Sequence, residues 1–169
     1  MSSPRSARRS PVVLIVEDHL PMREAMRVCI EGAFPGLSII EASDGATALQ
    51  CVEAHCPSLV LMDINLPDAN GVDLTRDILK QWPCTFVACV SIDTGGDLPE
   101  RVRAAGAVEF MGKDTLFKTL LPLVGAVFTL TNWLKGLESH SLIAEDSPQD
   151  MGTHAAYLLE TGARPVGQE

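Results

Sequence analysis

Five short apolar runs, rich in β-branched residues, recur along the chain and divide it into similar intervals. The runs cover residues 12–16, 37–40, 59–62, 86–90 and, more weakly, 108–111. They do not alternate with polar residues, which is typical of strands covered by helices on both faces of a parallel sheet. We therefore predict five buried strands at these positions.

Helical patterns separate the apolar runs. We predict helices over residues 21–33, 46–54, 72–81 and 98–105. In the first, Met22, Met26 and Cys29 recur at spacings of four and three residues, and Pro21 suits the opening turn. Asp44 precedes the second helix, where its carboxylate can cap the free amides. Each of the first four predicted strands is thus followed by a helical segment.

This alternation favours an α/β architecture, a doubly wound five-stranded parallel sheet with right-handed crossovers. In such sheets functional residues gather at the carboxyl ends of the strands. Polar side chains follow the predicted strands at that edge: Glu17, Asp18, Asp63, Ser91 and Lys113. We expect these five side chains to lie close together.

Three carboxylates at one edge repel one another unless a cation lies among them, and ligation by oxygen alone suits Mg²⁺. The pattern therefore predicts a magnesium site formed by Glu17, Asp18 and Asp63. Each acid taken singly has an ordinary alternative as a loop residue, and Asp18 can cap the first helix. The complete set, with a lysine and a hydroxyl beside it, favours a functional site.

Four segments, taken in order, carry a family resemblance: V-L-I-V-E-D-H, L-V-L-M-D-I-N-L-P-D-A-N-G, A-C-V-S and G-A-V-E-F-M-G-K-D. With them, residues 11–130 resemble the receiver domain of two-component response regulators. No single segment is specific, but the ordered set is. The resemblance implies the flavodoxin-like (βα)5 receiver fold.

The resemblance also implies a role for each residue at the strand ends. Asp63 matches the phosphoacceptor, and Lys113 matches the lysine that pairs with it. Glu17 and Asp18 match the acidic pair that binds Mg²⁺ together with Asp63 and the backbone carbonyl of Asn65. The implied partner is a histidine kinase or phosphotransfer protein, whose phosphohistidine Asp63 would attack.

Two further positions match the family's switch. Ser91 matches the hydroxyl that turns toward the phosphoryl group, and Phe110 matches the aromatic residue that moves into the vacated space. The resulting change of surface would signal to a downstream protein target. The resemblance thus implies a signalling protein and not an enzyme. Such a protein catalyses only its own phosphorylation and dephosphorylation.

Net charge and cysteine content limit the classes of binding partner and the cellular compartment that we expect for this protein. The net charge of -9 argues against a general affinity for nucleic acid or anionic membrane. The five cysteines are odd in number and form no C-x-x-C pair, which is typical of reduced cysteines. We therefore expect a cytoplasmic protein with protein partners.

Ile92 departs from the family pattern, because a small residue usually follows the switch hydroxyl. A branched side chain there can crowd the in-line path to Asp63. We predict slow phosphotransfer from small donors and a long-lived phosphoryl group, although Asn65 and Asp93 can still orient water.

A nearly uncharged segment over residues 116–134 predicts a fifth helix, in which Lys118 is the only charge. Its apolar residues fall on two opposite sides, Leu120, Leu123, Val127 and Leu134 against Leu121, Val124 and Phe128. Such a helix suits a protein interface, so we expect a homodimer or a docked partner. A membrane span is the alternative, which Pro122 and Gly125 weaken. The sequence leaves open whether Pro122 shifts the start of the helix to a later residue or kinks the helix.

We expect a polar tail over residues 1–10, one receiver domain over 11–134 and an acidic tail over 135–169, in which Ser147 can begin a short helix. The leading interpretation is a stand-alone, single-domain response regulator. One alternative is a receiver-like adaptor that works without phosphorylation, if Ile92 closes the site. The other is an aspartate-nucleophile phosphatase, which normally carries a second acid where this chain has Asn65.

Overall fold

The computed structural model describes the backbone of residues 11–141 and the side chains of residues 11–134. Its strands form one parallel sheet in the order β2-β1-β3-β4-β5. The strands are β1 (Val12–Val16), β2 (Ser38–Ala42), β3 (Leu59–Asp63), β4 (Phe86–Ser91) and β5 (Glu109–Gly112). The helices are α1 (Leu20–Ala33), α2 (Gly45–His55), α3 (Gly71–Gln81), α4 (Leu98–Ala104) and α5 (Leu116–Ser141). The predicted doubly wound α/β fold is confirmed.

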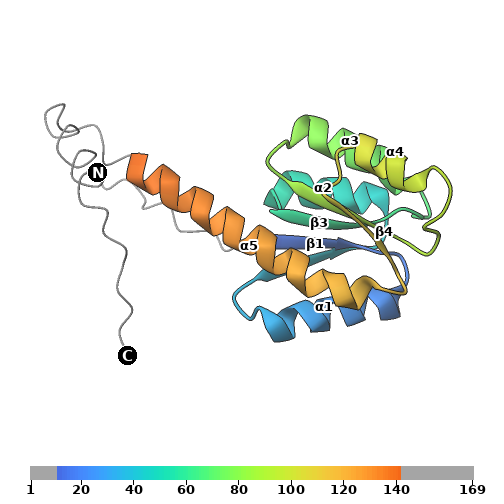
Figure 1. Cartoon of the computed structure of the whole chain (residues 1–169), viewed down its shortest axis with the longest axis horizontal. Coiled ribbons are helices and arrows are strands. Elements are labelled where there is room, and N and C mark those ends of the chain that lie inside the picture. Colours follow the sequence, from blue (N-terminus) through green and yellow to red (C-terminus); the bar gives the residue numbers. More distant parts are fainter. Residues whose placement is uncertain (1–10, 142–169) are drawn as a thin grey trace, which may run out of the picture. The chain divides into compact units, whose positions relative to one another are not determined.

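Helices cover both faces of this sheet, α1 and α5 on one face and α2, α3 and α4 on the other (Figure 1). Alternate residues of β1 enter opposite layers: Leu14 and Val16 pack toward α2 and α3, whereas Val13 and Ile15 pack toward α1 and α5. Because successive side chains of a strand point to opposite faces, a strand buried on both faces is apolar at every position. This explains why unbroken apolar runs predicted the strands.

The edge strand β2 differs most from its predicted bounds, residues 37–40. Leu37 lies outside it, because its backbone amide donates to the Phe34 carbonyl oxygen at 3.0 Å in the turn after α1. Ser38 and Glu41 belong to β2 although both are exposed. The apolar run thus predicted that the strand exists, whereas backbone pairing with β1 sets its bounds.

The helix starts confirm one predicted cap and exclude an alternative one. The Asp44 carboxylate accepts a hydrogen bond from the Thr47 amide at 2.7 Å and caps α2, as predicted. The alternative role of Asp18 as the cap of α1 does not hold, because His19 is at the N-cap position and its side chain makes no capping hydrogen bond. A proline in the first turn lacks an N–H, which leaves fewer amides to satisfy.

Helix α5 extends to Ser141, beyond the predicted end at residue 134, and continues through Pro122. Its buried side chains form one stripe, Leu116, Leu120, Val124 and Val127. The predicted division into two opposite apolar sides was therefore wrong about Val124. Leu116–Leu134 is long and apolar enough, by length and composition, to cross a membrane. Its four buried side chains pack with those of α1 on one face of the sheet, while most of the segment is half-buried or exposed.

The chain separates into two compact units, residues 1–131 and 132–169. The site described below lies in the first. The predicted polar tail at residues 1–10 and the short helix expected after Ser147 lie outside the described residues.

Candidate functional site

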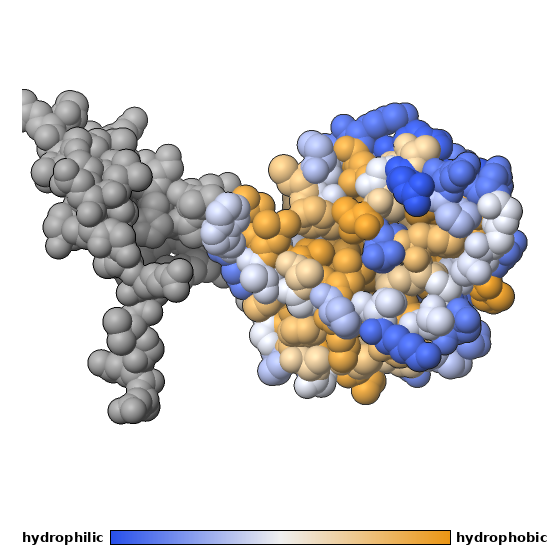
Figure 2. Space-filling view, in the orientation of Figure 1, coloured by the Kyte–Doolittle hydropathy of each residue, from blue (hydrophilic) through white to orange (hydrophobic). Residues whose placement is uncertain are grey.

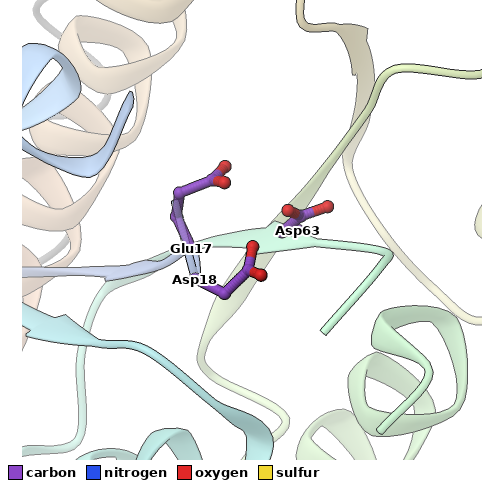
Figure 3. Close-up of side chains that lie close together, drawn as sticks. All are labelled: Glu17, Asp18 and Asp63. Carbon is purple, nitrogen blue, oxygen red and sulfur yellow. The ribbon is translucent and has the colours of Figure 1, made fainter. Parts of the chain in front are cut away.

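Two neighbouring strands bring three carboxylates to one edge of the sheet. Val16, the last residue of β1, is paired in register with Met62 of β3, so Glu17 and Asp18 follow β1 beside Asp63. Figure 3 shows the three side chains near the ends of these strands. One carboxylate oxygen from each lies within 4.8 Å of the other two. The predicted acidic cluster is therefore formed.

Lys113 enters the cluster from the loop after β5. Its backbone amide donates to the Ser91 carbonyl oxygen at 2.8 Å, which ties the start of this loop to the end of β4. Its ammonium donates to Asp63 Oδ2 at 2.7 Å and to Glu17 Oε1 at 2.8 Å. The side chains are 13% exposed for Lys113, 2% for Asp63 and 1% for Glu17. The three thus form a nearly buried ionic group.

Burial and charge shift two of these groups. Burial raises the pKa of Glu17; the hydrogen bond from Lys113 opposes this effect, and the neighbouring charge of Asp63 adds to it. Burial by itself lowers the pKa of Lys113, but its hydrogen bonds to Asp63 and Glu17 outweigh burial, and that pKa is raised. Lys113 therefore remains a cation, and one ammonium faces three carboxyl groups.

The donor set fits a hard divalent cation. Glu17 Oε2 is buried and accepts no well-formed hydrogen bond from the described residues, although Lys113 Nζ lies 2.8 Å away. Asp18 is exposed, so water can complete the coordination from that side. Glu17, Asp18 and Asp63 would hold the ion. The Asn65 carbonyl remains a predicted ligand; the Asn65 amide donates to Asp63 Oδ1 at 3.0 Å.

The loop after β3 closes tightly against the backbone of Asp63. Asn65 and Asn70 form a bridge across it, and the Gly71 amide donates to the Ile64 carbonyl oxygen at 2.8 Å. An added Cβ at Gly71 would lie 2.7 Å from Ile64 Cα and closer still to the Asp63 carbonyl oxygen. A glycine is therefore needed for this loop to hold Asp63 at the strand end.

Asp68, in the same loop, was missed by sequence reasoning. Its carboxylate accepts hydrogen bonds from the Gly45 amide at 2.7 Å and the Ala46 amide at 3.0 Å. Asp68 therefore binds the first turn of α2, beside the cap formed by Asp44. It connects that helix to the loop that follows Asp63. The only signal in the sequence was an acidic residue in a loop, because the contact joins residues far apart along the chain.

The predicted switch residues lie on the two strands beyond β3. Ser91 is fully buried at the end of β4, and its Oγ accepts a hydrogen bond from the Asp93 amide at 3.2 Å. Phe110 of β5 is half-buried and packs against the layer that contains α3 and α4. Ile92 is 79% exposed and adjoins Ser91. The structure thus places Ser91 at the edge and Phe110 two residues before the end of β5, while the switch movement stays a prediction.

Comparison with known proteins finds bacterial regulatory proteins that are similar to this chain. DegU of Brevibacillus brevis, a transcriptional regulatory protein, is 30% identical over 135 residues, which are 79% of this chain and 56% of DegU. The response regulator UvrY of Escherichia coli K12 is 27% identical over 150 residues, which are 88% of this chain and 68% of UvrY. This chain therefore spans little more than half the length of DegU.

Solved receiver domains share the fold. The signal receiver domain of a Luxo repressor protein from Vibrio parahaemolyticus has a TM-score of 0.70 at 24% identity and covers 77% of this chain and 98% of its own. A CheY-like receiver domain protein from Methanospirillum hungatei has a TM-score of 0.67 at 22% identity, with coverage of 73% and 98%. These likenesses establish the fold.

The family follows from a match over residues 13–124, described as the response regulator receiver domain. The match includes Glu17, Asp18, Asp63, Ser91 and Lys113. It confirms the resemblance drawn from the four sequence segments. Because it covers more than half of the 169 residues, this chain belongs to the response regulator receiver domain family of two-component systems.

Proposed function

We propose that the chain accepts a phosphoryl group on Asp63 from a histidine kinase or phosphotransfer protein. The observation that carries this proposal is the contact of the Asp63 carboxylate with the Lys113 ammonium at 2.7 Å, inside a cluster of three acids. Family membership implies phosphoryl acceptance on an aspartate. Among the described acids, Asp63 alone is the last residue of a central strand with both a lysine and two acids beside it.

The chemistry is a transfer between two nucleophiles. A carboxylate oxygen of Asp63 attacks the phosphorus of a phosphohistidine in line, the P–N bond breaks, and the imidazole leaves with the bonding electrons. The product is an acyl phosphate. Bound Mg²⁺ supplies charge neutralisation to the phosphoryl oxygens. Lys113, which the site keeps protonated, gives up its bond to Asp63 Oδ2 and pairs with a phosphoryl oxygen.

The conformational change that follows phosphorylation of Asp63 would begin at Ser91. Its buried hydroxyl accepts a hydrogen bond from the Asp93 amide and retains a proton to donate to an incoming phosphoryl oxygen. Movement of Ser91 toward that oxygen would leave space for Phe110, which is only half-buried. Phosphorylation would then shift the population toward a state with a different β5 surface.

We propose protein partners and a cytoplasmic location. The net charge of -9 weighs against binding to a polyanion over most of the surface. DNA is the alternative partner, because relatives such as DegU are named transcriptional regulators. A salt-dependent mobility shift on mixed genomic fragments would favour that alternative, and no shift at low salt would favour protein partners.

A second copy of the chain is the partner that α5 favours. Apolar residues recur along this helix at alternating spacings of four and three, Leu116, Leu120, Leu123, Val127 and Leu130. The first positions pack on the sheet, whereas Leu130 is 40% exposed and lies beyond residue 124, where the family match ends. Figure 2 shows apolar residues gathered on the face that carries α5 and α1. Trp133 and Leu134 are exposed as well, so the end of the helix presents a group of exposed apolar side chains that a second copy would cover.

Light scattering on two matched variants tests the homodimer. Leu130→Glu places a charge among the exposed apolar side chains, whereas Thr129→Glu places the same charge on an adjacent exposed polar position. We expect the first to give a monomer and the second to retain the dimer of the wild type. A wild type that is monomeric at high concentration, with and without phosphorylation, would refute the proposal.

Intact mass after incubation with acetyl phosphate or phosphoramidate and Mg²⁺ tests the main proposal. A stable adduct that Asp63→Asn abolishes supports phosphoacceptance. Absence of any adduct, also from a kinase, favours the adaptor that works without phosphorylation. Continuous release of phosphate with no lasting adduct favours the phosphatase, although Asn65 stands where that class normally has its second acid.

A further inference from the structure

Arg23 of α1 contacts the loop that carries two of the acids. Its Nη1 donates to the backbone carbonyl oxygen of Glu17 at 2.6 Å, and its Nε lies 3.4 Å from Glu41 Oε1 on β2. The side chain is 16% exposed. One guanidinium therefore joins the end of β1 to the neighbouring edge strand, outside the set of residues that would touch the phosphoryl group.

These contacts fix the peptide group that leads to Asp18. The amide of Glu17 donates to the Ala42 carbonyl oxygen at 3.0 Å, and the carbonyl of Glu17 accepts from Arg23. In the described part of the chain no hydrogen bond reaches the carboxylate of Asp18, which is exposed. The backbone on either side of Asp18 is held instead, by the side chain of Arg23 at the Glu17 carbonyl and by the amides of Met22 and Arg23 at the His19 carbonyl.

We propose that Arg23 is a positioning residue for the metal site, and that it acts through the Glu17 carbonyl to hold Asp18 toward Asp63. The inference rests on the proposed use of Mg²⁺ at this site. Glu41 supports the arrangement, because its carboxylate lies against the Nε of Arg23 and fixes the plane of the guanidinium. Outer residues that orient metal ligands contribute to metal affinity without touching the ion.

Arg27 provides a matched control one turn further along α1. Its Nε lies 3.6 Å from the other oxygen of Glu41, and its Nη1 pairs with Glu31 at 3.0 Å. It therefore carries the same charge on the same helix and shares the same acid, while its hydrogen bonds do not include the Glu17 carbonyl. Replacing either arginine removes one positive charge from this side of the molecule.

Loss of the Arg23 charge and loss of its positioning role predict opposite effects on Mg²⁺ affinity. Removing a cation near an acidic cluster makes the local potential more negative, which favours a divalent ion. Loss of positioning does the reverse, because Asp18 no longer presents its oxygen to the site. A weaker affinity after loss of Arg23 therefore cannot come from the charge change, and Arg27 measures the charge effect alone.

The test is a Mg²⁺ titration of the full-length chain, followed by the backbone amide resonances of residues 17–19 and 63–65. We expect Arg23→Gln to raise the dissociation constant about tenfold, with Arg27→Gln equal to the wild type or slightly tighter. Arg23→Lys keeps the charge but lacks the planar fork, and should fall between. The Mg²⁺ concentration for half-maximal phosphorylation should rise in Arg23→Gln while the rate at saturating Mg²⁺ is retained.

Equal Mg²⁺ affinity in Arg23→Gln and Arg27→Gln would overturn the positioning role while leaving the metal site intact. Absence of Mg²⁺ binding by the wild type would overturn the metal site and this inference together. If Arg23→Gln does not fold, Arg23→Lys gives the same test, because it keeps the positive charge and lacks the planar fork that contacts both the Glu17 carbonyl and Glu41. It should weaken Mg²⁺ binding in the same direction, and an unchanged affinity there would also count against the role.

Discussion

Lys113 Nζ lies 2.7 Å from Asp63 Oδ2, so the one ammonium that the described residues bring to the acidic cluster contacts the acid that we propose as nucleophile. The same nitrogen lies 2.8 Å from Glu17. In the absence of a metal ion, Lys113 therefore balances two buried carboxylates. This gives the lysine a role in stability that is separate from its role in transfer.

Lys113→Met should destabilise the metal-free protein by about 3 kcal/mol, because it leaves Asp63 and Glu17 buried without a counter-charge. Mg²⁺ should restore more stability to this variant than to the wild type, since the ion replaces the lost cation. Urea unfolding with and without MgCl₂ measures both effects. The matched control is Lys118→Met, an exposed lysine on α5, which should change stability by less than about 0.5 kcal/mol. Equal losses in the two variants would contradict the balancing role.

Ile92→Ala should shorten the lifetime of the phosphoryl group. Ile92 is 79% exposed and follows Ser91 directly, so it can shield the acyl phosphate from water without contributing to the core. Stability should change by less than about 0.5 kcal/mol. The measurement is loss of phosphoryl label from purified protein, with Val28→Ala as control because Val28 is another exposed apolar residue, on α1. Equal rates for Ile92→Ala and the wild type would rule out shielding.

Much of the site could be predicted because the parallel sheet places strand ends together. Once the apolar runs 12–16 and 59–62 are read as neighbouring strands, the residues that follow them must meet at one edge. Glu17, Asp18 and Asp63 were found in this way. Their proximity depends on topology alone, which a pattern of buried strands predicts well.

The supporting contacts could not be predicted, because they join residues with no shared local pattern. Arg23 reaches a backbone carbonyl, and any residue has one. Asp68 binds amides of α2 that lie more than twenty positions away. The extent of α5 was also missed, since composition becomes polar after Leu134 while the helix continues to Ser141. Apolar periodicity predicts the buried part of a helix and not its exposed end.

Asp44 should make stability depend on acid pH. Its pKa is lowered from the ordinary 3.8, first by the hydrogen bond from the Thr47 amide and then by hydroxyl groups of Thr47 and Ser43. A carboxyl whose folded pKa is depressed contributes stability that is complete above 3.8 and is lost as the pH falls through the lower folded value. Asp44→Asn keeps an N-cap acceptor without the charge, so it should lack this loss. Urea midpoints at pH 7 and below pH 4 measure the difference, and parallel pH profiles would disprove it.

Gly71→Ala and Gly32→Ala should shift stability in opposite directions. An added Cβ at Gly71 would lie 2.7 Å from Ile64 Cα, which is backbone and cannot turn aside, so we expect a loss of at least about 2 kcal/mol. Gly32 lies within α1 with no atom within 4 Å of an added Cβ, and alanine there should gain about 0.5–1 kcal/mol from helix propensity. Urea unfolding measures both. Because the loop at Gly71 holds Asp63 at the end of β3, its variant should also accept phosphoryl groups more slowly at the same Mg²⁺ concentration. A Gly71→Ala protein as stable and as reactive as the wild type would show that the loop can move away from Asp63 at no cost.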